Sequence, residues 1–105
     1  MLENFEPDFA KATVVASPNH GERVDVSAPD MIILHYTGMD TEEGALSWLC
    51  NPDSQVSSHY FVRENGEVLQ LVPETRRAWH AGKSYWRGIE DINSRSIGIE
   101  ISNAG

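Results

Sequence analysis

The sequence predicts an α/β fold in which a central mixed β-sheet is flanked by α-helices. Three features carry this prediction: an apolar run at 31–34, an Asn65-Gly66 pair between two β-rich runs, and a strict apolar-polar alternation over 96–102. A helical pattern lies between the first two features. Strands that alternate along the chain with helical segments are typical of α/β domains.

Length and charge limit the protein class. A chain of 105 residues, 40% of them hydrophobic, is one domain or part of one and can bury a core. Its net charge is −8, from 8 basic and 16 acidic residues. A nucleic-acid binder needs clustered Lys and Arg to neutralise phosphates, and the basic pairs here are short, as in Arg76-Arg77. We therefore expect no nucleic-acid partner.

The sequence also bears on location and redox chemistry. No stretch of about 18 apolar residues could span a membrane, and the first nine residues carry acidic groups in place of the basic start of a secretory signal. With Met1 as the true start, we expect a cytoplasmic protein without a membrane partner. Cys50 is the single cysteine, which excludes an intrachain disulfide, and we expect it to be a small buried side chain on a helix.

The first third of the chain predicts an approach segment and then a strand. Residues 1–29 are polar and interrupted by prolines, which indicates an extended N-terminal segment. Val14 and Val15 within it are candidates for a short edge strand. The run 31–34 is apolar without alternation, which favours a central strand covered on both faces.

A helix is expected next. Asp40 is a candidate N-cap, and Glu43 follows at the spacing of a capping box. Asn51-Pro52 should end the helix. Its apolar side consists of four residues: Ala45, Leu46, Trp48 and Leu49.

A hairpin and a long loop should follow the helix. The β-rich runs 59–63 and 67–72 flank Asn65-Gly66, which favours a tight turn with both residues at positive φ. Residues 73–95 are rich in Gly, Trp and charge and predict a long loop over one side of the sheet. Loops of this length in compact domains are usually functional.

The last predicted strand places a carboxylate among apolar residues. Its isoleucines share one face, and Glu100 lies on the other face beside Gly98, which leaves room next to the carboxylate. An isolated carboxylate in a sheet is unfavourable unless it meets water, a cation or a hydrogen-bond partner. The alternation leaves two interpretations open: a hydrated Glu100 on an exposed edge strand, or a carboxylate in a site.

His35, at the end of an apolar strand, is open to two interpretations as well. It is a packing residue or a metal ligand, and His20, His59 and His80 lie beside turns or strand ends and could converge with it. A catalytic zinc site needs about three protein ligands and an open position. No HExxH-type helix motif supplies two of them together. Spacing alone does not decide between the two.

Several segments in order resemble the zinc-dependent N-acetylmuramoyl-L-alanine amidase family, which includes phage lysozymes of the amidase type and peptidoglycan recognition proteins. The resemblance runs from residue 17 to about 105 and is greatest to the cytosolic branch that recycles anhydro-muramyl peptides. The matching segments are 17–21 with 32–37, 56–62 with the turn 64–66, 77–82 and 91–100.

The resemblance implies roles for individual residues. His35 corresponds to the first zinc ligand, and Glu100 corresponds to the general base that takes a proton from zinc-bound water. The resulting hydroxide attacks the amide that joins (anhydro-)N-acetylmuramic acid to L-alanine, so peptidoglycan fragments are the expected partners. Four further residues correspond to substrate contacts or to supports of the site: His59, Trp79, His80 and Asn103.

The sequence also departs from the family pattern. Ser58 stands where many phage and animal members carry tyrosine, which fits the bacterial branch. The family's second zinc histidine and its third ligand lie downstream of the last strand, so one of three ligands is present. We expect 30–105 to be the N-terminal portion of a single catalytic domain, truncated at the C-terminus, with weak zinc binding or none. The alternative is a genuinely short form that binds a metal through His35, His59 and His80. An inactive fragment that lacks two of the zinc ligands is an alternative to the active amidase.

Two other function classes remain open. One is a non-catalytic muropeptide-binding module, and the other is a small interaction domain that uses the loop with Trp79, Tyr85 and Trp86. Glu100 separates the amidase from both, because a binding protein needs no base at that position.

Overall fold

The computed structural model describes residues 5–83 and 85–103. The outer ends of the two predicted segments, 1–29 and 30–105, lie outside these residues. The strands are β1 (Thr13–Val14), β2 (His20–Glu22), β3 (Met31–Tyr36), β4 (Tyr60–Val62), β5 (Val68–Gln70), β6 (Arg76–Ala78) and β7 (Ser96–Ile101), and the helices are α1 (Glu42–Leu49) and α2 (Ile92–Arg95). No helix in the described ranges is long and apolar enough to cross a membrane.

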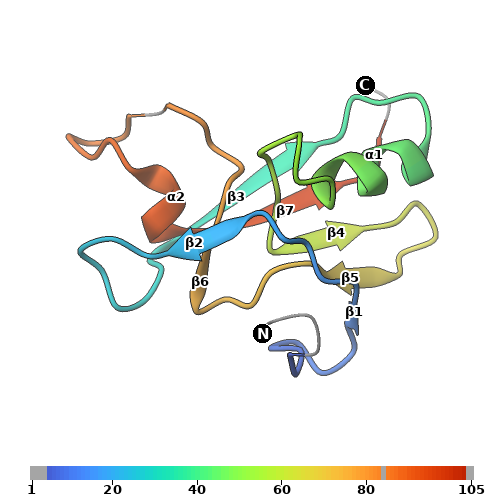
Figure 1. The fold of residues 1–105 in the computed structure, drawn as a ribbon, viewed down its shortest axis with the longest axis horizontal. Coiled ribbons are helices and arrows are strands. Elements are labelled where there is room, and N and C mark those ends of the chain that lie inside the picture. Colours follow the sequence, from blue (N-terminus) through green and yellow to red (C-terminus); the bar gives the residue numbers. More distant parts are fainter. Residues whose placement is uncertain (1–4, 84, 104–105) are drawn as a thin grey trace.

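The strands form a mixed sheet of five and a separate pair. The order in the large sheet is β1-β5-β4-β7-β3, and β2 pairs with β6 (Figure 1). The predicted α/β class with a central mixed sheet is confirmed. The short edge strand expected at Val14 and Val15 exists as β1, but it covers Thr13 and Val14, so Val15 lies just after it.

β7 is an interior strand that lies between β4 and β3 and runs parallel to both. This excludes the edge-strand interpretation of Glu100. In the register of these strands, Glu100 is the partner of His35 on β3 and of Phe61 on β4. Register partners in a sheet point to the same face. The fold therefore brings His35 and Glu100 together on one side of the sheet.

The prediction that 31–34 is a central strand covered on both faces is wrong. β3 is an edge strand that pairs, within the described residues, with β7 alone. Its outward-facing side chains Ile32, Leu34 and Tyr36 are 69%, 64% and 65% exposed. An unbroken apolar run indicates that both faces of a strand are apolar, but it does not specify the strand's place in the sheet.

α1 begins one residue later than predicted. Thr41, not Asp40, is the N-cap, and its side-chain oxygen accepts a hydrogen bond from the Gly44 N–H at 3.0 Å. The helix ends at Leu49, two residues before Asn51 of the predicted stop. Cys50, which was expected to be a buried side chain on a helix, is the C-cap of α1 and is half-buried against the core.

The hairpin β4-β5 forms as predicted, but its turn is different. Of the two turn residues, only Gly66 has a positive φ, 90°. The Gly66 N–H donates to the Arg63 carbonyl at 2.9 Å, and the Arg63 N–H donates to the Glu67 carbonyl at 2.8 Å. The Asn65 side chain accepts from the Glu67 N–H at 2.8 Å, which is an Asx turn. The loop is therefore longer than a two-residue turn.

The stretch 73–95 is more ordered than the predicted long loop, because it contains β6 and α2. β6 pairs antiparallel with β2 from the N-terminal segment, so its partner is more than 50 residues away in sequence. Local sequence gives no signal for such a pairing. α2 is capped by Asp91, whose side chain accepts from the Ser94 N–H at 3.3 Å.

The main core lies between α1 and the face of the sheet that carries Glu100. Its buried members are Ala45, Leu49, Phe61, Leu69, Leu71, Val72 and Ala78. Part of the N-terminal segment is also buried: the Asn19 side chain donates to the carbonyls of Asn51 and Val56, both at 2.8 Å. This packing fixes α1 and the residues that follow it beside the C-terminal ends of β3 and β7.

Candidate active site

A cavity of about 230 Å³ lies at the C-terminal ends of β3 and β7. α1 contributes apolar side chains to its wall, and the chain segments that follow β3, α1 and β6 complete it. The residues with polar side chains that line it are His35, Tyr36, Thr37, Ser57, Trp79, His80 and Glu100. Four of the six predicted site residues are thus brought to one cavity.

His35 and Glu100 face each other across the strand pair. His35 Nδ1 lies 3.9 Å from Glu100 Oε2, which is beyond hydrogen-bond distance. The Glu100 side chain is 15% exposed, and burial raises the pKa of its carboxyl to about 7. A carboxyl with a pKa near 7 can both accept and release a proton near neutral pH, as a general base and acid must.

His80 lies directly beside this pair. Its Nδ1 is 3.0 Å from His35 Nε2, and its Nε2 is 2.8 Å from Ser96 Oγ. A Cβ at Gly98 would lie 2.5 Å from His80 Cγ, so the room that the glycine leaves is filled by the His80 ring. Burial lowers the pKa of His80 to about 3 and also lowers the pKa of His35. Both imidazoles are therefore neutral at pH 7.

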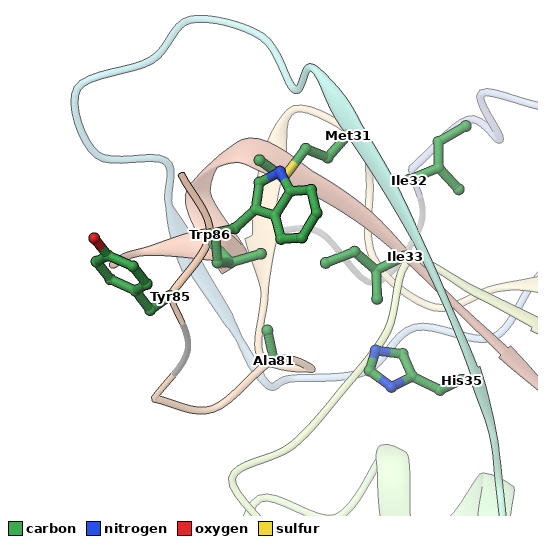
Figure 2. Close-up of a pocket in the computed structure, with 8 residues that line it drawn as sticks. Met31, Ile32, Ile33, His35, Ala81, Tyr85 and Trp86 are labelled. Atoms are coloured by element: carbon green, nitrogen blue, oxygen red, sulfur yellow. The ribbon is translucent and has the colours of Figure 1, made fainter. Parts of the chain in front are cut away.

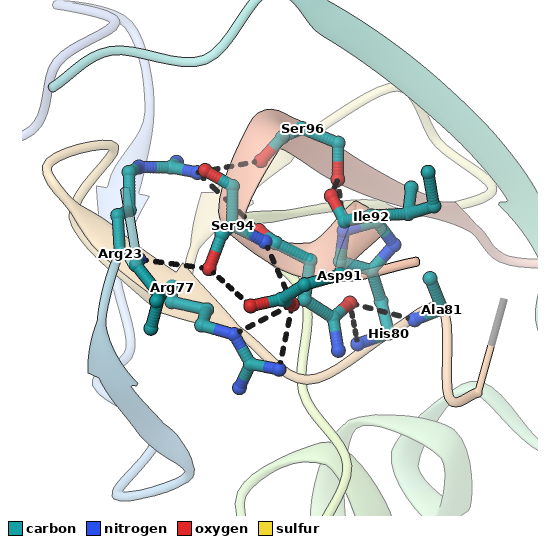
Figure 3. A network of polar contacts seen from close by, with 10 residues as sticks. Arg23, Arg77, His80, Ala81, Asp91, Ile92, Ser94 and Ser96 are labelled. Carbon is teal, nitrogen blue, oxygen red and sulfur yellow. Dashed lines mark hydrogen bonds and ion pairs between the residues drawn. The ribbon is translucent and has the colours of Figure 1, made fainter. Parts of the chain in front are cut away.

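A network of polar contacts around α2 holds the backbone of His80 in place (Figure 3). The N–H groups of His80 and Ala81 both donate to Asn93 Oδ1, at 3.0 and 2.8 Å, and Asn93 is buried. Asp91, the cap of α2, accepts from Nη2 and Nε of Arg77 at 2.9 and 3.1 Å. Sequence patterns single out neither Asn93 nor Asp91, because a short helix has no hydrophobic period to mark it.

Arg23 holds the other end of α2. Its guanidinium donates to the carbonyls of Ser94 at 2.9 Å and Ser96 at 3.1 Å, and to the carbonyl of Glu74 at 2.7 Å. The final carbonyls of a helix have no partner within the helix, and a cation is favourable there. Sequence reasoning missed Arg23, because a single arginine in a polar segment is typical of an exposed side chain.

Comparison with known proteins identifies the family. Residues 25–105 match the family model described as N-acetylmuramoyl-L-alanine amidase. The chain belongs to this amidase family. AmiD of Escherichia coli is 48% identical over 82 residues, which are 71% of this chain and 29% of AmiD. AmpD of Salmonella typhimurium, a 1,6-anhydro-N-acetylmuramyl-L-alanine amidase, is 33% identical over 110 residues, which are 89% of this chain and 59% of AmpD.

Solved structures of amidases share the fold. A crystal structure of a selenomethionine derivative of AmpD matches with a TM-score of 0.80 and 31% identity, covering 94% of this chain and 65% of that one. Escherichia coli AmiD, in complex with anhydro-N-acetylmuramic acid-L-Ala-D-γ-Glu-L-Lys, matches with a TM-score of 0.64 and 42% identity over 80% of this chain and 35% of AmiD. The chain spans 29% and 59% of the lengths of the curated AmiD and AmpD relatives.

Two of the residues that the amidase resemblance assigns to the site lie outside the cavity lining. His59 is fully buried: its Nδ1 accepts from the Gly98 N–H at 3.0 Å, and its Nε2 donates to the Arg76 carbonyl at 2.9 Å. Of its two expected roles, this favours support of the site. Asn103 follows β7, and its carbonyl accepts from the Gly38 N–H at 2.8 Å.

The histidines do not gather around one point. His20 lies on β2, where its Nδ1 accepts from Arg76 Nε at 3.2 Å. His59 uses both ring nitrogens within the protein, and one nitrogen of His35 faces one nitrogen of His80. Within 5–83 and 85–103, no three His, Cys, Asp or Glu side chains are placed to hold a metal ion. The described side chains do not form a complete zinc site, and we derive no step through a metal.

Two further hollows adjoin the cavity that contains His35 and Glu100. A groove of about 490 Å³ shares Trp79 and His80 with it and is also lined by Arg77 and Lys83. An apolar pocket of about 590 Å³ lies on the other side of His35. Figure 2 shows Trp86 facing Met31 and Ile33 of β3 in this pocket, with the His35 ring at one end.

Proposed function

We propose that this chain carries the proton-transfer centre of an N-acetylmuramoyl-L-alanine amidase. The reaction is hydrolysis of the amide between (anhydro-)N-acetylmuramic acid and L-alanine in peptidoglycan fragments. The observation that carries the proposal is Glu100, a lone carboxyl on an interior strand that faces His35 in a cavity and whose pKa is raised to about 7. A residue that only stabilised the sheet would gain nothing from such burial.

The chemistry assigns Glu100 two successive tasks. In its ionised form it takes a proton from the water that attacks the lactyl carbonyl carbon. In its protonated form it gives that proton to the nitrogen of L-alanine as the carbon–nitrogen bond breaks. A pKa near the working pH suits both transfers. His35 remains the predicted zinc ligand, and no step of this proposal passes through the ion.

The groove beside Trp79 is the proposed site of the peptide. A peptidoglycan stem carries carboxylates, and Lys83 supplies positive charge to this groove in a chain of net charge −8, beside Arg77, whose guanidinium is paired with Asp91. The names of the relatives support the substrate class, since AmpD is a 1,6-anhydro-N-acetylmuramyl-L-alanine amidase and AmiD is seen with an anhydro-muramyl tripeptide. The cytoplasmic location expected from the sequence is part of this proposal, because released anhydro fragments are the substrates expected there.

The test is a cleavage assay on a defined muropeptide. Purified protein, with and without added zinc, is incubated with anhydro-N-acetylmuramyl-L-Ala-D-γ-Glu-L-Lys, and the products are separated and weighed by mass spectrometry. We expect anhydro-N-acetylmuramic acid and a free tripeptide with L-alanine at its N-terminus. Cleavage at another bond, or tight binding without cleavage, would contradict the amidase proposal. The second of these outcomes would support the muropeptide-binding module instead.

A further inference from the structure

Ser96 makes two buried hydrogen bonds with a single hydroxyl. Its Oγ lies 2.8 Å from the Ile92 carbonyl and 2.8 Å from His80 Nε2, and the residue is fully buried. A carbonyl oxygen can only accept, and a hydroxyl has one proton to give. The Ser96 proton therefore goes to the Ile92 carbonyl, and Ser96 Oγ accepts from His80 Nε2–H.

The same assignment of donors and acceptors extends from Ser96 through His80 to His35 in the cavity. A neutral imidazole carries one N–H, so His80 Nδ1 has a lone pair and accepts from His35 Nε2–H at 3.0 Å. His35 Nδ1 is then left unprotonated. It is this atom that lies 3.9 Å from Glu100 Oε2, on the side chain that lines the cavity.

The opposite direction is less favourable. If Ser96 donated to His80 instead, its oxygen and the Ile92 carbonyl oxygen would face each other at 2.8 Å with no proton between them, which is unfavourable. If all these hydrogen bonds were reversed, His35 would carry its proton on Nδ1. This atom lies 3.9 Å from Glu100 Oε2, which is too far for a hydrogen bond. In the proposed direction, His35 donates to His80, His80 donates to Ser96 and Ser96 donates to the Ile92 carbonyl. All three hydrogen bonds then form, at 3.0, 2.8 and 2.8 Å.

We propose that Ser96 is a positioning residue, which fixes the Nε2–H tautomer of His80 and thereby presents the unprotonated Nδ1 of His35 to the cavity. The residue touches no reacting atom and acts through two imidazoles. Its effect on rate rests on the proposed function, whereas its effect on the tautomers does not. Asn93 assists by fixing the backbone of His80 through two hydrogen bonds.

The experiment measures imidazole ¹⁵N chemical shifts at pH 7.5 in the wild type, Ser96→Ala, Ser96→Thr and a control, Ser102→Ala. Ser102 lies after β7, and its N–H donates to the Val62 carbonyl at 2.9 Å. In the wild type, we expect His35 and His80 to carry their proton on Nε2. Ser96→Ala should give mixed tautomers at His80, whereas Ser96→Thr and Ser102→Ala should keep the wild-type pattern. Protonation on Nδ1 in the wild type, or unchanged tautomers in folded Ser96→Ala, would overturn the proposal.

Kinetics on the muropeptide separate this proposal from the proposed function. Ser96→Ala should lower kcat by about tenfold with little change in KM, because an interaction made in the transition state is weakened. Ser96→Thr should restore kcat. An unchanged kcat in Ser96→Ala would overturn the positioning role. A wild type that cleaves nothing would count against the amidase proposal, while the ¹⁵N shifts would still decide the tautomers.

Discussion

The imidazole of His80 occupies the volume in which any residue other than glycine at position 98 would place its side chain. A Cβ on Gly98 would lie 2.5 Å from Cγ and 2.6 Å from Cδ2 of that ring. Such distances essentially never occur, so the ring position and the glycine depend on each other. The Gly98 N–H meanwhile donates to His59 Nδ1 at 3.0 Å. One glycine thus couples a histidine that lines the cavity to a fully buried histidine.

Gly98→Ala should displace His80 and weaken the fold. Inserting a methyl group into packed surroundings lowers the free energy of unfolding by about 1–3 kcal/mol, and the shifted ring should also lower kcat. Gly21→Ala is the matched control, because a Cβ there would meet only Trp79 Nε1, at 3.9 Å. Urea denaturation of both variants checks the prediction. Equal stability of the two variants would show that the ring gives way without cost.

His59 should make stability depend on pH. Burial lowers its pKa from 6.5 to about 4, so the unfolded chain binds more protons between these values. The contribution of a neutral His59 is complete above pH 6.5 and is lost as the pH falls towards 4, a total of about 3 kcal/mol.

The comparison that isolates this effect is wild type against His59→Gln. Urea denaturation from pH 7.5 to 4.5 should give a shallower pH dependence in the variant, by up to about 1.4 kcal/mol per pH unit. Glu100, whose raised pKa acts with the opposite sign, and His80 are present in both proteins and cancel. Parallel pH profiles for the two proteins would rule out the assigned protonation of His59.

Arg23→Lys should loosen α2. A lysine keeps the charge but cannot reach the carbonyls of Glu74, Ser94 and Ser96 together, because it lacks the forked donors. We expect a loss of about 1–3 kcal/mol in the free energy of unfolding, measured by urea denaturation. Arg87→Lys is the control, since that side chain lies over the exposed Trp86 ring. A loss of the same size in both variants would argue against the role of Arg23.

Trp79→Ala should weaken substrate binding more than chemistry. The indole lines both the cavity and the groove with Arg77 and Lys83, so its removal takes away contact area in the ground state and the transition state alike. KM for the muropeptide should rise about tenfold with kcat nearly unchanged. Trp86→Ala, on the far side of His35, serves as the control and should change KM less. A fall in kcat alone would place Trp79 in the chemical step.

The sequence predicts the strands best where the hydrophobic pattern matches the burial of the side chains. The alternation over 96–102 corresponds to β7, and the β-rich runs correspond to β4 and β5. It predicts poorly where the partner is distant: β6 depends on β2, and the edge position of β3 is set by its neighbours. The N-cap of α1 and the turn between β4 and β5 differ from the prediction. In each case one side-chain hydrogen bond, to Thr41 or to Asn65, replaces a predicted arrangement of similar stability.

The residues of the site also differ in how well the sequence predicts them. His35 and Glu100 could be predicted because a histidine and a carboxylate stand out in apolar strands, and the register then pairs them. The residues that hold His80 and α2 could not be predicted, because Ser96, Asn93 and Arg23 are ordinary polar residues whose partners lie 16, 13 and up to 73 positions away. Their importance arises from tertiary contacts alone.

The central claim is that Glu100 transfers the proton in amide cleavage, and Glu100→Gln tests it most directly. The amide keeps the size of the side chain but cannot take a proton, so kcat for the anhydro-muramyl tripeptide should fall by about 10²–10⁴-fold with KM little changed. Binding of the intact substrate, measured by calorimetry, should be retained. A variant that cleaves the substrate with the wild-type kcat would contradict the account.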